Sequence, residues 1–164
     1  MDRLFAPWRS QYIAGFKQGV DRPGCVFCAA LESHDDEAML LIYRSSEAFV
    51  LMNRYPYNSG HLLIIPNRHT NAFESLSAAE SSDMQQLLVK SNAALTELVR
   101  PHAFNIGMNL GRTAGAGIDD HLHWHIVPRW DGDTNFMTVT ADVKLISEDM
   151  TKQWRALREV FEKV

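Results

Sequence analysis

The chain has no long hydrophobic run. Its longest apolar segment, residues 38–43, is too short to span a membrane, and residues 1–9 contain no unbroken apolar stretch of signal-peptide length. These absences argue against a membrane protein and against a secreted one. We therefore expect a cytoplasmic protein without a membrane partner.

Cysteine is scarce as well, since Cys25 and Cys28 are the only two in 164 residues. In a cytoplasmic chain such a pair rarely forms a structural disulfide. The C-x-x-C pair can then be a metal site, a redox pair, or two small buried residues. His69 and His121 could complete a tetrahedral Cys₂His₂ set with it, and zinc prefers such ligands.

An excess of positive charge is also missing. The chain has 16 Lys and Arg against 20 Asp and Glu, a formal net charge of -4. It therefore lacks the basic footprint of a polynucleotide-binding protein, although a small anionic ligand needs only a local positive site. A length of 164 residues with 46% hydrophobic residues favours a single domain over residues 1–164.

Three histidines stand at alternating positions in residues 121–129, which read HLHWHIVPR. In an extended chain, alternate side chains point to the same face, so His121, His123 and His125 would share one face and the residues between them the other. Imidazole can act as nucleophile, proton carrier or metal ligand. The spacing therefore predicts a reaction centre or, alternatively, a metal site.

A glycine-rich segment, residues 109–118, leads directly into these histidines and has glycines at 111, 115 and 117. It fits neither the P-loop nor the dinucleotide fingerprint. Backbone N–H groups of such a loop can point at an anion. Together with the imidazoles, the loop suggests phosphoryl or nucleotidyl transfer, in which a nucleophile attacks phosphorus and donors stabilise the developing charge.

The apolar patterning predicts an α+β fold. Five segments have the composition of strands: residues 38–43, 48–53, 61–66, 104–110 and 121–127. A long helix begins at the capping-box pair Ser77 and Glu80 and ends before Pro101, and it can cover one face of the sheet. A C-terminal amphipathic helix is expected at about residues 148–163, with Ser147 as its N-cap.

The pattern H-x-H-x-H-x-x-P-R after a glycine-rich loop resembles the histidine triad superfamily of nucleotide hydrolases and transferases. Residues 53–69 and 129–137 resemble the bacterial branch that includes diadenosine tetraphosphate phosphorylases. The resemblance covers residues 25–137, which we take as the core of the domain. It implies a HIT-like fold with a five-stranded antiparallel sheet, and a homodimer.

The resemblance also implies roles for particular residues. His123 would be the nucleophile and form a nucleotidyl-histidine intermediate, which water or phosphate resolves. His125 would assist the leaving group, and His121 would orient the site or hold zinc. The nucleotide-binding positions that the resemblance and the glycine-rich loop suggest are Val26, Phe27, Asn53, Asn109, Gly115, Gly117 and Ile118.

Some proteins of this kind hold zinc with a cysteine pair, a histidine after the second core strand, and the first triad histidine. Those positions correspond here to Cys25, Cys28, His69 and His121. Four protein ligands leave no open coordination position, so the zinc would be structural. No catalytic metal is expected, because a neutral imidazole is already nucleophilic.

The leading functional hypothesis is an enzyme that cleaves a phosphoanhydride of a dinucleoside polyphosphate, by phosphorolysis or hydrolysis. Its partners would be an adenine mononucleotide or dinucleotide and inorganic phosphate. Relatives in other branches place Gln followed by Ser or Thr where this chain has Gly117 and Ile118, a difference that favours the phosphorylase branch. Two alternatives are a nucleoside phosphoramidase acting on adenylated amines and a non-catalytic, zinc-stabilised nucleotide-binding module.

Overall fold

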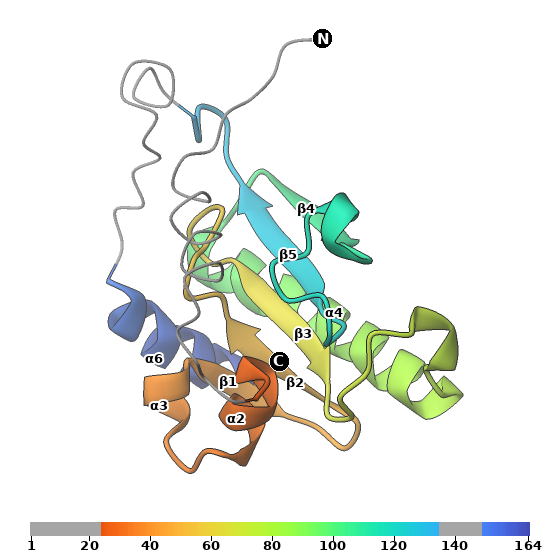
Figure 1. Cartoon of the computed structure of the whole chain (residues 1–164). Helices are drawn as coiled ribbons and strands as arrows, with labels where there is room; N and C mark the ends of the chain where they lie inside the picture. The colour runs from red at the N-terminus through yellow and green to blue at the C-terminus, as the bar shows by residue number, and fades with distance from the viewer. Residues whose placement is uncertain (1–23, 135–148) are drawn as a thin grey trace, which may run out of the picture.

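The computed structural model describes residues 24–134 and 149–164, and in this part of the chain five antiparallel strands form one sheet (Figure 1). The order of the strands across the sheet is β1-β2-β3-β5-β4. Their bounds are β1 Leu41–Arg44, β2 Ala48–Met52, β3 Leu62–Pro66, β4 Ala103–Met108 and β5 Trp124–Arg129. The predicted α+β class and five-stranded antiparallel sheet are confirmed. The single-domain organisation of residues 1–164 stays a prediction.

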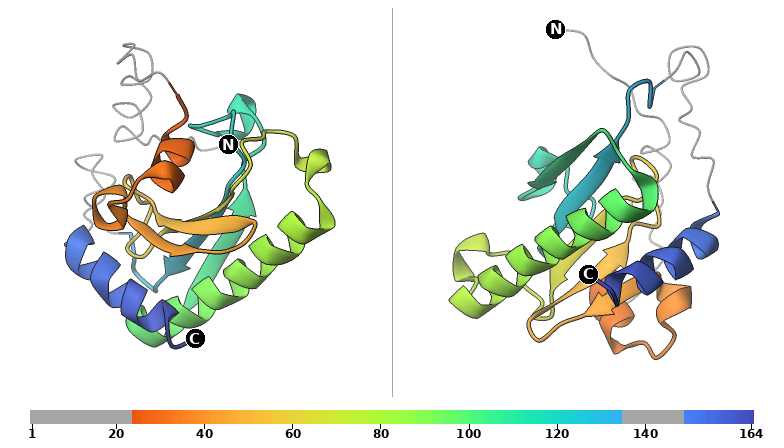
Figure 2. Two further views of the ribbon diagram at one scale, coloured as in Figure 1. Left: turned by 90° about the horizontal axis from the view of Figure 1, so that it is seen from below. Right: turned by 180° about the vertical axis from the view of Figure 1, so that it is seen from behind.

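Two helices cover one face of the sheet, the long α4 (Ala78–Val99) and the C-terminal α6 (Met150–Phe161). The view from behind shows them side by side across the strands (Figure 2). Leu95 of α4 and Leu157 of α6 are fully buried in one cluster with Ile64 of β3. None of the helices in residues 24–134 and 149–164 is long and apolar enough to cross a membrane.

A short helix, α2 (Val26–Glu32), covers part of the opposite face. Its Phe27 and Ala30 are buried in a second cluster, against Phe49 and Ile65 of the central strands. The sequence patterning did not predict this helix. Its position matters because it lies on the face to which the histidines point.

The predicted strand at residues 38–43 is partly wrong. Residues Asp36–Met39 form the short helix α3, and β1 begins only at Leu41. The Asp35 carboxylate accepts a hydrogen bond from the Ala38 N–H at 3.0 Å and so caps the helix. The apolar run 38–43 therefore spans the end of a helix, the left-handed residue Leu40 (φ 62°) and the start of a strand.

Two further predicted strands have different bounds. The fifth strand was expected at 121–127, but its pairing with β3 and β4 begins at Trp124, so His121 and His123 lie just before the ladder. The fourth ends at Met108, which places Asn109 after it. Helix α6 starts at Met150 and is capped by the Asp149 carboxylate. The predicted cap Ser147 and residues 135–137 of the predicted core lie outside the described residues.

Candidate active site and adjoining metal-ligand cluster

The three triad imidazoles lie in a row on the face that α2 partly covers. The ring centroids of His123 and His125 are 4.9 Å apart. Phe27 of α2 packs its ring edge-on against both His121 (5.6 Å) and His123 (5.0 Å). Leu122 and Ile126, which alternate with the histidines, are buried. The alternation expected of an extended chain therefore extends beyond the hydrogen-bonded part of β5.

The proton position on His123 follows from the hydrogen bond that its Nδ1 makes. Its Nδ1 lies 2.9 Å from the backbone oxygen of His121. A carbonyl oxygen can only accept, so Nδ1 carries the proton and Nε2 carries a lone pair in the neutral ring. Burial lowers the pKa of His123 below its ordinary value. The ring is therefore neutral at pH 7, with a nucleophilic Nε2.

Neutral His125 is the opposite tautomer, because its hydrogen bond with His61 determines which ring nitrogen carries the proton. The Tyr57 backbone N–H and the Asn53 side-chain amide both lie 3.1 Å from His61 Nδ1, which must therefore accept. His61 Nε2 then carries the proton and donates it to His125 Nδ1 at 2.9 Å. Neutral His125 consequently carries its own proton on Nε2.

Burial holds the pKa of His61 well below its ordinary value, and the neighbouring His125 and His123 lower it further. His61 is thus neutral, as the hydrogen-bond chain requires. The site pairs an imidazole that offers a lone pair, His123, with one that offers a proton, His125. His61 is not among the residues that the sequence analysis selected, although its spacing, two residues before Leu63 and four before Ile65, places it on the same face.

Four further side chains converge at the other end of the row. The ligand atoms of Cys25, Cys28, His69 and His121 all lie within 4.8 Å of one another, so this cluster could hold a metal ion. Cys25 Sγ lies 3.3 Å from His121 Nδ1, and Cys28 Sγ lies 3.4 Å from His69 Nδ1. The edges of a tetrahedron around zinc are roughly 3.3–3.8 Å for ordinary Zn–N and Zn–S bonds, so the separations suit that ion.

The tautomer of His121 also suits a metal ligand. Its Nε2 donates to the Pro66 backbone oxygen at 2.9 Å, which leaves the lone pair of the neutral ring on Nδ1, the atom that faces the two sulfurs. A carbonyl that holds the second ring nitrogen is the usual support for a ligating histidine. The four ligands come from three places: α2 and its N-cap, the segment after β3, and the segment before β5.

The proposed nucleotide-binding residues fall into two groups. Phe27 is buried under the triad, Val26 is exposed beside it, and Asn53 is hydrogen-bonded to His61. Asn109 and Gly115 belong to the loop after β4, together with Gly117 and Ile118, and Gly115 has a φ of 99° that favours glycine. An ion pair between Arg112 and Asp119 (2.6 Å) spans this loop. Binding of a nucleotide by either group stays a prediction.

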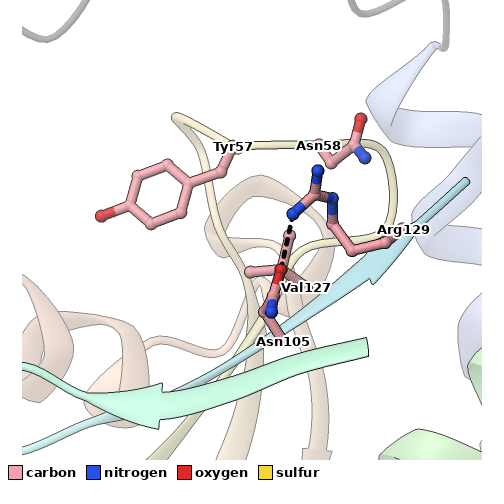
Figure 3. Close-up of a pocket in the computed structure, with 5 residues that line it drawn as sticks. All are labelled: Tyr57, Asn58, Asn105, Val127 and Arg129. Carbon is pink, nitrogen blue, oxygen red and sulfur yellow. Dashed lines mark hydrogen bonds between the residues drawn. The ribbon is translucent and has the colours of Figure 1, made fainter. Parts of the chain in front are cut away.

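A small cavity of about 230 Å³, whose lining residues are drawn in Figure 3, adjoins His125 through the ring of Tyr57. Five residues that the sequence reasoning did not select line it: Tyr57, Asn58, Asn105, Val127 and Arg129. The Tyr57 ring stacks against His125 with centroids 5.6 Å apart. The signal in the sequence was present, because Val127 and Arg129 continue the alternation of the histidines along β5.

Fold and site together define a class of proteins with a row of alternating histidines on an antiparallel sheet. The chain belongs to the HIT domain family, whose model matches residues 36–132. It is 35% identical over 153 residues to a Mycobacterium tuberculosis protein named AP-4-A phosphorylase, covering 90% of this chain and 78% of that one. A Schizosaccharomyces pombe asymmetrical bis(5'-nucleosyl)-tetraphosphatase is 30% identical over 93 residues, which are 57% of this chain and half of that protein.

Solved structures agree with this assignment. A zinc-bound histidine triad family protein from Mycobacterium smegmatis superposes with a TM-score of 0.69 at 26% identity, covering 85% of this chain and 94% of that one. The family and fold expected from the HxHxH pattern are therefore confirmed.

Proposed function

We propose that this protein cleaves a dinucleoside polyphosphate such as diadenosine tetraphosphate, and that it transfers the nucleotidyl group first to His123 and then to inorganic phosphate. The observation that carries the proposal is the opposite protonation of two adjacent imidazoles, His123 at Nδ1 and His125 at Nε2. The similarity to a protein named AP-4-A phosphorylase supports the substrate and the phosphate acceptor.

In the first step, the lone pair on His123 Nε2 attacks the α-phosphorus. A P–N bond forms as the bond from phosphorus to the bridging oxygen breaks, and the electron pair of that bond stays on the leaving nucleotide. The Nε2–H of neutral His125 donates a hydrogen bond to the leaving oxygen and stabilises the negative charge that this oxygen acquires, and His125 keeps its proton. His123 keeps its own proton on Nδ1, where the carbonyl oxygen of His121 stabilises the positive charge that the ring acquires.

In the second step, inorganic phosphate attacks the nucleotidyl group on His123. The P–N bond breaks and its electron pair returns to His123 Nε2, which restores the neutral ring. The attacking phosphate oxygen carries no proton, and the Nε2–H of His125 holds it by a hydrogen bond. For diadenosine tetraphosphate the first product is ATP and the second is ADP. With water in place of phosphate, the second product is AMP.

The nucleotide would lie between α2 and the glycine-rich loop. Val26 and Phe27 would contact the base, and Asn53 would bind the ribose. Asn109 and the backbone N–H groups from Gly115 to Ile118 would hold the α-phosphate. This placement is supported by the position of Phe27 against the His123 ring and by the loop's continuity with the triad segment.

Zinc would be held by Cys25, Cys28, His69 and His121, and when bound it would add a cross-link between α2 and the segments around β3 and β5. These four side chains leave no position for substrate. His121 contributes to the reaction through its backbone oxygen, which orients His123, so the cluster and the reaction centre share one residue.

Incubation of the purified protein with diadenosine tetraphosphate, with and without inorganic phosphate, tests the proposal. We expect ADP and ATP in equal amounts, and only when phosphate is present. AMP and ATP without phosphate would instead establish hydrolysis, an activity that the similarity to the tetraphosphatase also supports. The absence of any product, with nucleotide still bound, would favour a binding module. Cleavage of adenosine phosphoramidates alone would favour the phosphoramidase.

A further inference from the structure

The cavity beside His125 is not used by the reaction described above, although an arginine and two asparagines line it. It lies on the same face as the triad, because Val127 and Arg129 are two and four residues beyond His125 on β5. The Tyr57 ring joins the two regions, since it stacks on His125 and also lines the cavity (Figure 3).

The lining suits an anion. The Arg129 guanidinium donates to the Asn105 side-chain oxygen at 2.7 Å and, through Nε and Nη2, to both oxygens of Asp133. Among the described residues these bonds use three of its five N–H groups and leave two for a ligand. The Asn105 side-chain nitrogen offers further donors.

The Asp133 carboxylate, which forms an ion pair with Arg129, does not line the cavity. The side chain of Asp133 is 6% exposed and is not part of the lining, whereas that of Arg129 is 42% exposed and is part of it. Asn58 helps to hold the carboxylate, because its amide donates to Asp133 Oδ2 at 2.9 Å. The pair therefore fixes the guanidinium in place and presents its cationic side to the cavity.

The geometry also limits the direction in which a substrate can extend. At the His121 end, the Phe27 ring and the metal-ligand cluster fill the space beside the triad. At the His125 end the cavity opens. Along an extended strand Val127 lies roughly 13 Å from His123, and the Arg129 guanidinium reaches back to this level, because it bonds to Asn105, the β4 residue that pairs with Val127. A polyphosphate chain whose α-phosphate is at His123 would reach Arg129 with the phosphates farthest from the bond that breaks.

We infer that this cavity binds the distal phosphates of the leaving nucleotide, an assignment that rests on the function proposed above. Its volume of about 230 Å³ is below the roughly 300–1,000 Å³ of pockets that enclose drug-sized ligands, so it suits phosphate groups better than a whole nucleoside. The cavity thereby selects substrates by the length of the phosphate chain. A tetraphosphate extends farther toward Arg129 and Asn105 than a shorter chain does.

Two variants test the cavity. Asn105→Asp keeps the oxygen that accepts from Arg129 and places a negative charge in the lining, so the fold is retained and anions are repelled. Arg129→Gln removes the guanidinium. The matched controls are Asn71→Asp, the same charge change at an exposed position outside the lining, and Arg155→Gln, which removes an exposed, ion-paired arginine of α6.

Calorimetric titration with inorganic tripolyphosphate measures the affinity of the cavity for phosphate groups in the absence of catalysis. We expect Asn105→Asp and Arg129→Gln to raise its Kd at least about tenfold, as for a lost charge-assisted contact of about 1.4 kcal/mol, and the controls to match wild type. Equal affinity in all five proteins, or no binding to wild type, would overturn the assignment.

Kinetics separate this inference from the proposed function. The variants should lower kcat/KM at least tenfold for diadenosine tetraphosphate but not for adenosine 5'-(p-nitrophenyl phosphate), whose leaving group has no phosphate. Equal losses on both substrates would count against the cavity. If wild type cleaves neither substrate while the tripolyphosphate results hold, the proposed reaction fails and the anion site stands.

Discussion

At the scale of single residues, the chemistry depends on the hydrogen-bond partner of Nδ1 in each imidazole. For His123 the partner is a backbone oxygen, and for His125 it is the N–H of another imidazole. The spacing in the sequence predicted that three histidines share a face, because alternation is a local property of extended backbone. The protonation state of His125 could not be predicted in the same way, because it depends on His61, which is 64 residues away in sequence.

Replacement of His61 tests this dependence. In a His61→Ala variant, His125 Nδ1 loses its donor and is free to hold the proton itself, so His125 Nε2 no longer donates a hydrogen bond to the leaving oxygen. Loss of one donor to a developing oxyanion costs roughly 10²–10³ in kcat. Because only the tautomer of His125 changes, we expect a loss of kcat on the order of tenfold to 100-fold with little change in KM. Steady-state kinetics on diadenosine tetraphosphate measure both constants.

A substrate with a good leaving group provides the control for His61. The p-nitrophenolate of adenosine 5'-(p-nitrophenyl phosphate) spreads its negative charge over its own ring and depends little on a hydrogen bond from His125, so His61→Ala should leave its kcat near that of wild type. An equal loss on both substrates would mean that His61 acts only through stability.

At the scale of the elements, the sequence predicted a helix end correctly where a side chain caps the helix. The capping box of α4 is present as predicted, since Ser77 Oγ accepts from the Glu80 N–H and a Glu80 carboxylate oxygen accepts from the Ser77 N–H. Helix α2 was missed because its N-cap, Cys25, makes no side-chain capping bond. Packing of Phe27 and Ala30 on the sheet stabilises that helix, and such packing is not visible in a seven-residue segment.

The capping box has a measurable effect on stability. Ser77→Ala removes the acceptor for the Glu80 N–H and should lower the free energy of unfolding by about 1 kcal/mol, as measured by urea denaturation near pH 7. A change below a few tenths of a kcal/mol would show that tertiary packing alone determines where α4 begins.

The charge of Glu80 makes the folding stability depend on pH. Hydrogen bonds from Arg68 and Ser77 lower the pKa of Glu80 from 4.5 to about 2. A carboxyl whose pKa is lower in the folded state adds stability above its unfolded pKa, and loses it as the pH falls. We expect Glu80→Gln to be less stable than wild type at pH 7 and the difference to shrink between pH 4.5 and 2. A difference independent of pH would refute an ionic contribution.

At the scale of the whole molecule, the metal-ligand cluster connects α2 to the sheet. We expect about one zinc per chain in protein purified without chelator, and Cys25→Ser should lower the melting temperature more than it lowers activity. His69→Ala should behave in the same way. Elemental analysis and thermal melts test this, and a folded Cys25→Ser protein with no activity would contradict a structural role.

Metal binding should depend on pH. Without metal, burial and the nearby Cys25 raise the pKa of the Cys28 thiol to about 11. Zinc must displace this proton, because the thiolate is the ligand, so its apparent affinity should fall as the pH is lowered from 8 to 6. Competition with a chromogenic chelator measures the trend, and an affinity that does not change with pH would exclude the two thiols as ligands.

Homodimerisation and a cytoplasmic location stay predictions from the sequence. Strand β4 lies at one edge of the sheet, and its Ile106 is exposed. Sheet edges with unpaired N–H and C=O groups readily pair with another strand. We expect sedimentation equilibrium to give twice the chain mass of 18.6 kDa, and Ile106→Lys to shift the mass toward one chain. A wild-type monomer at micromolar concentration would contradict the prediction.

The central claim is that His123 carries the nucleotidyl group between two steps. Brief incubation with diadenosine tetraphosphate without phosphate, followed by digestion at neutral pH and mass spectrometry, should find an acid-labile adenylyl group on the peptide that contains residues 121–129. His123→Ala should lack the adduct, lose several powers of ten in turnover and still bind nucleotide. An adduct on another residue, or substantial turnover by His123→Ala, would contradict the account.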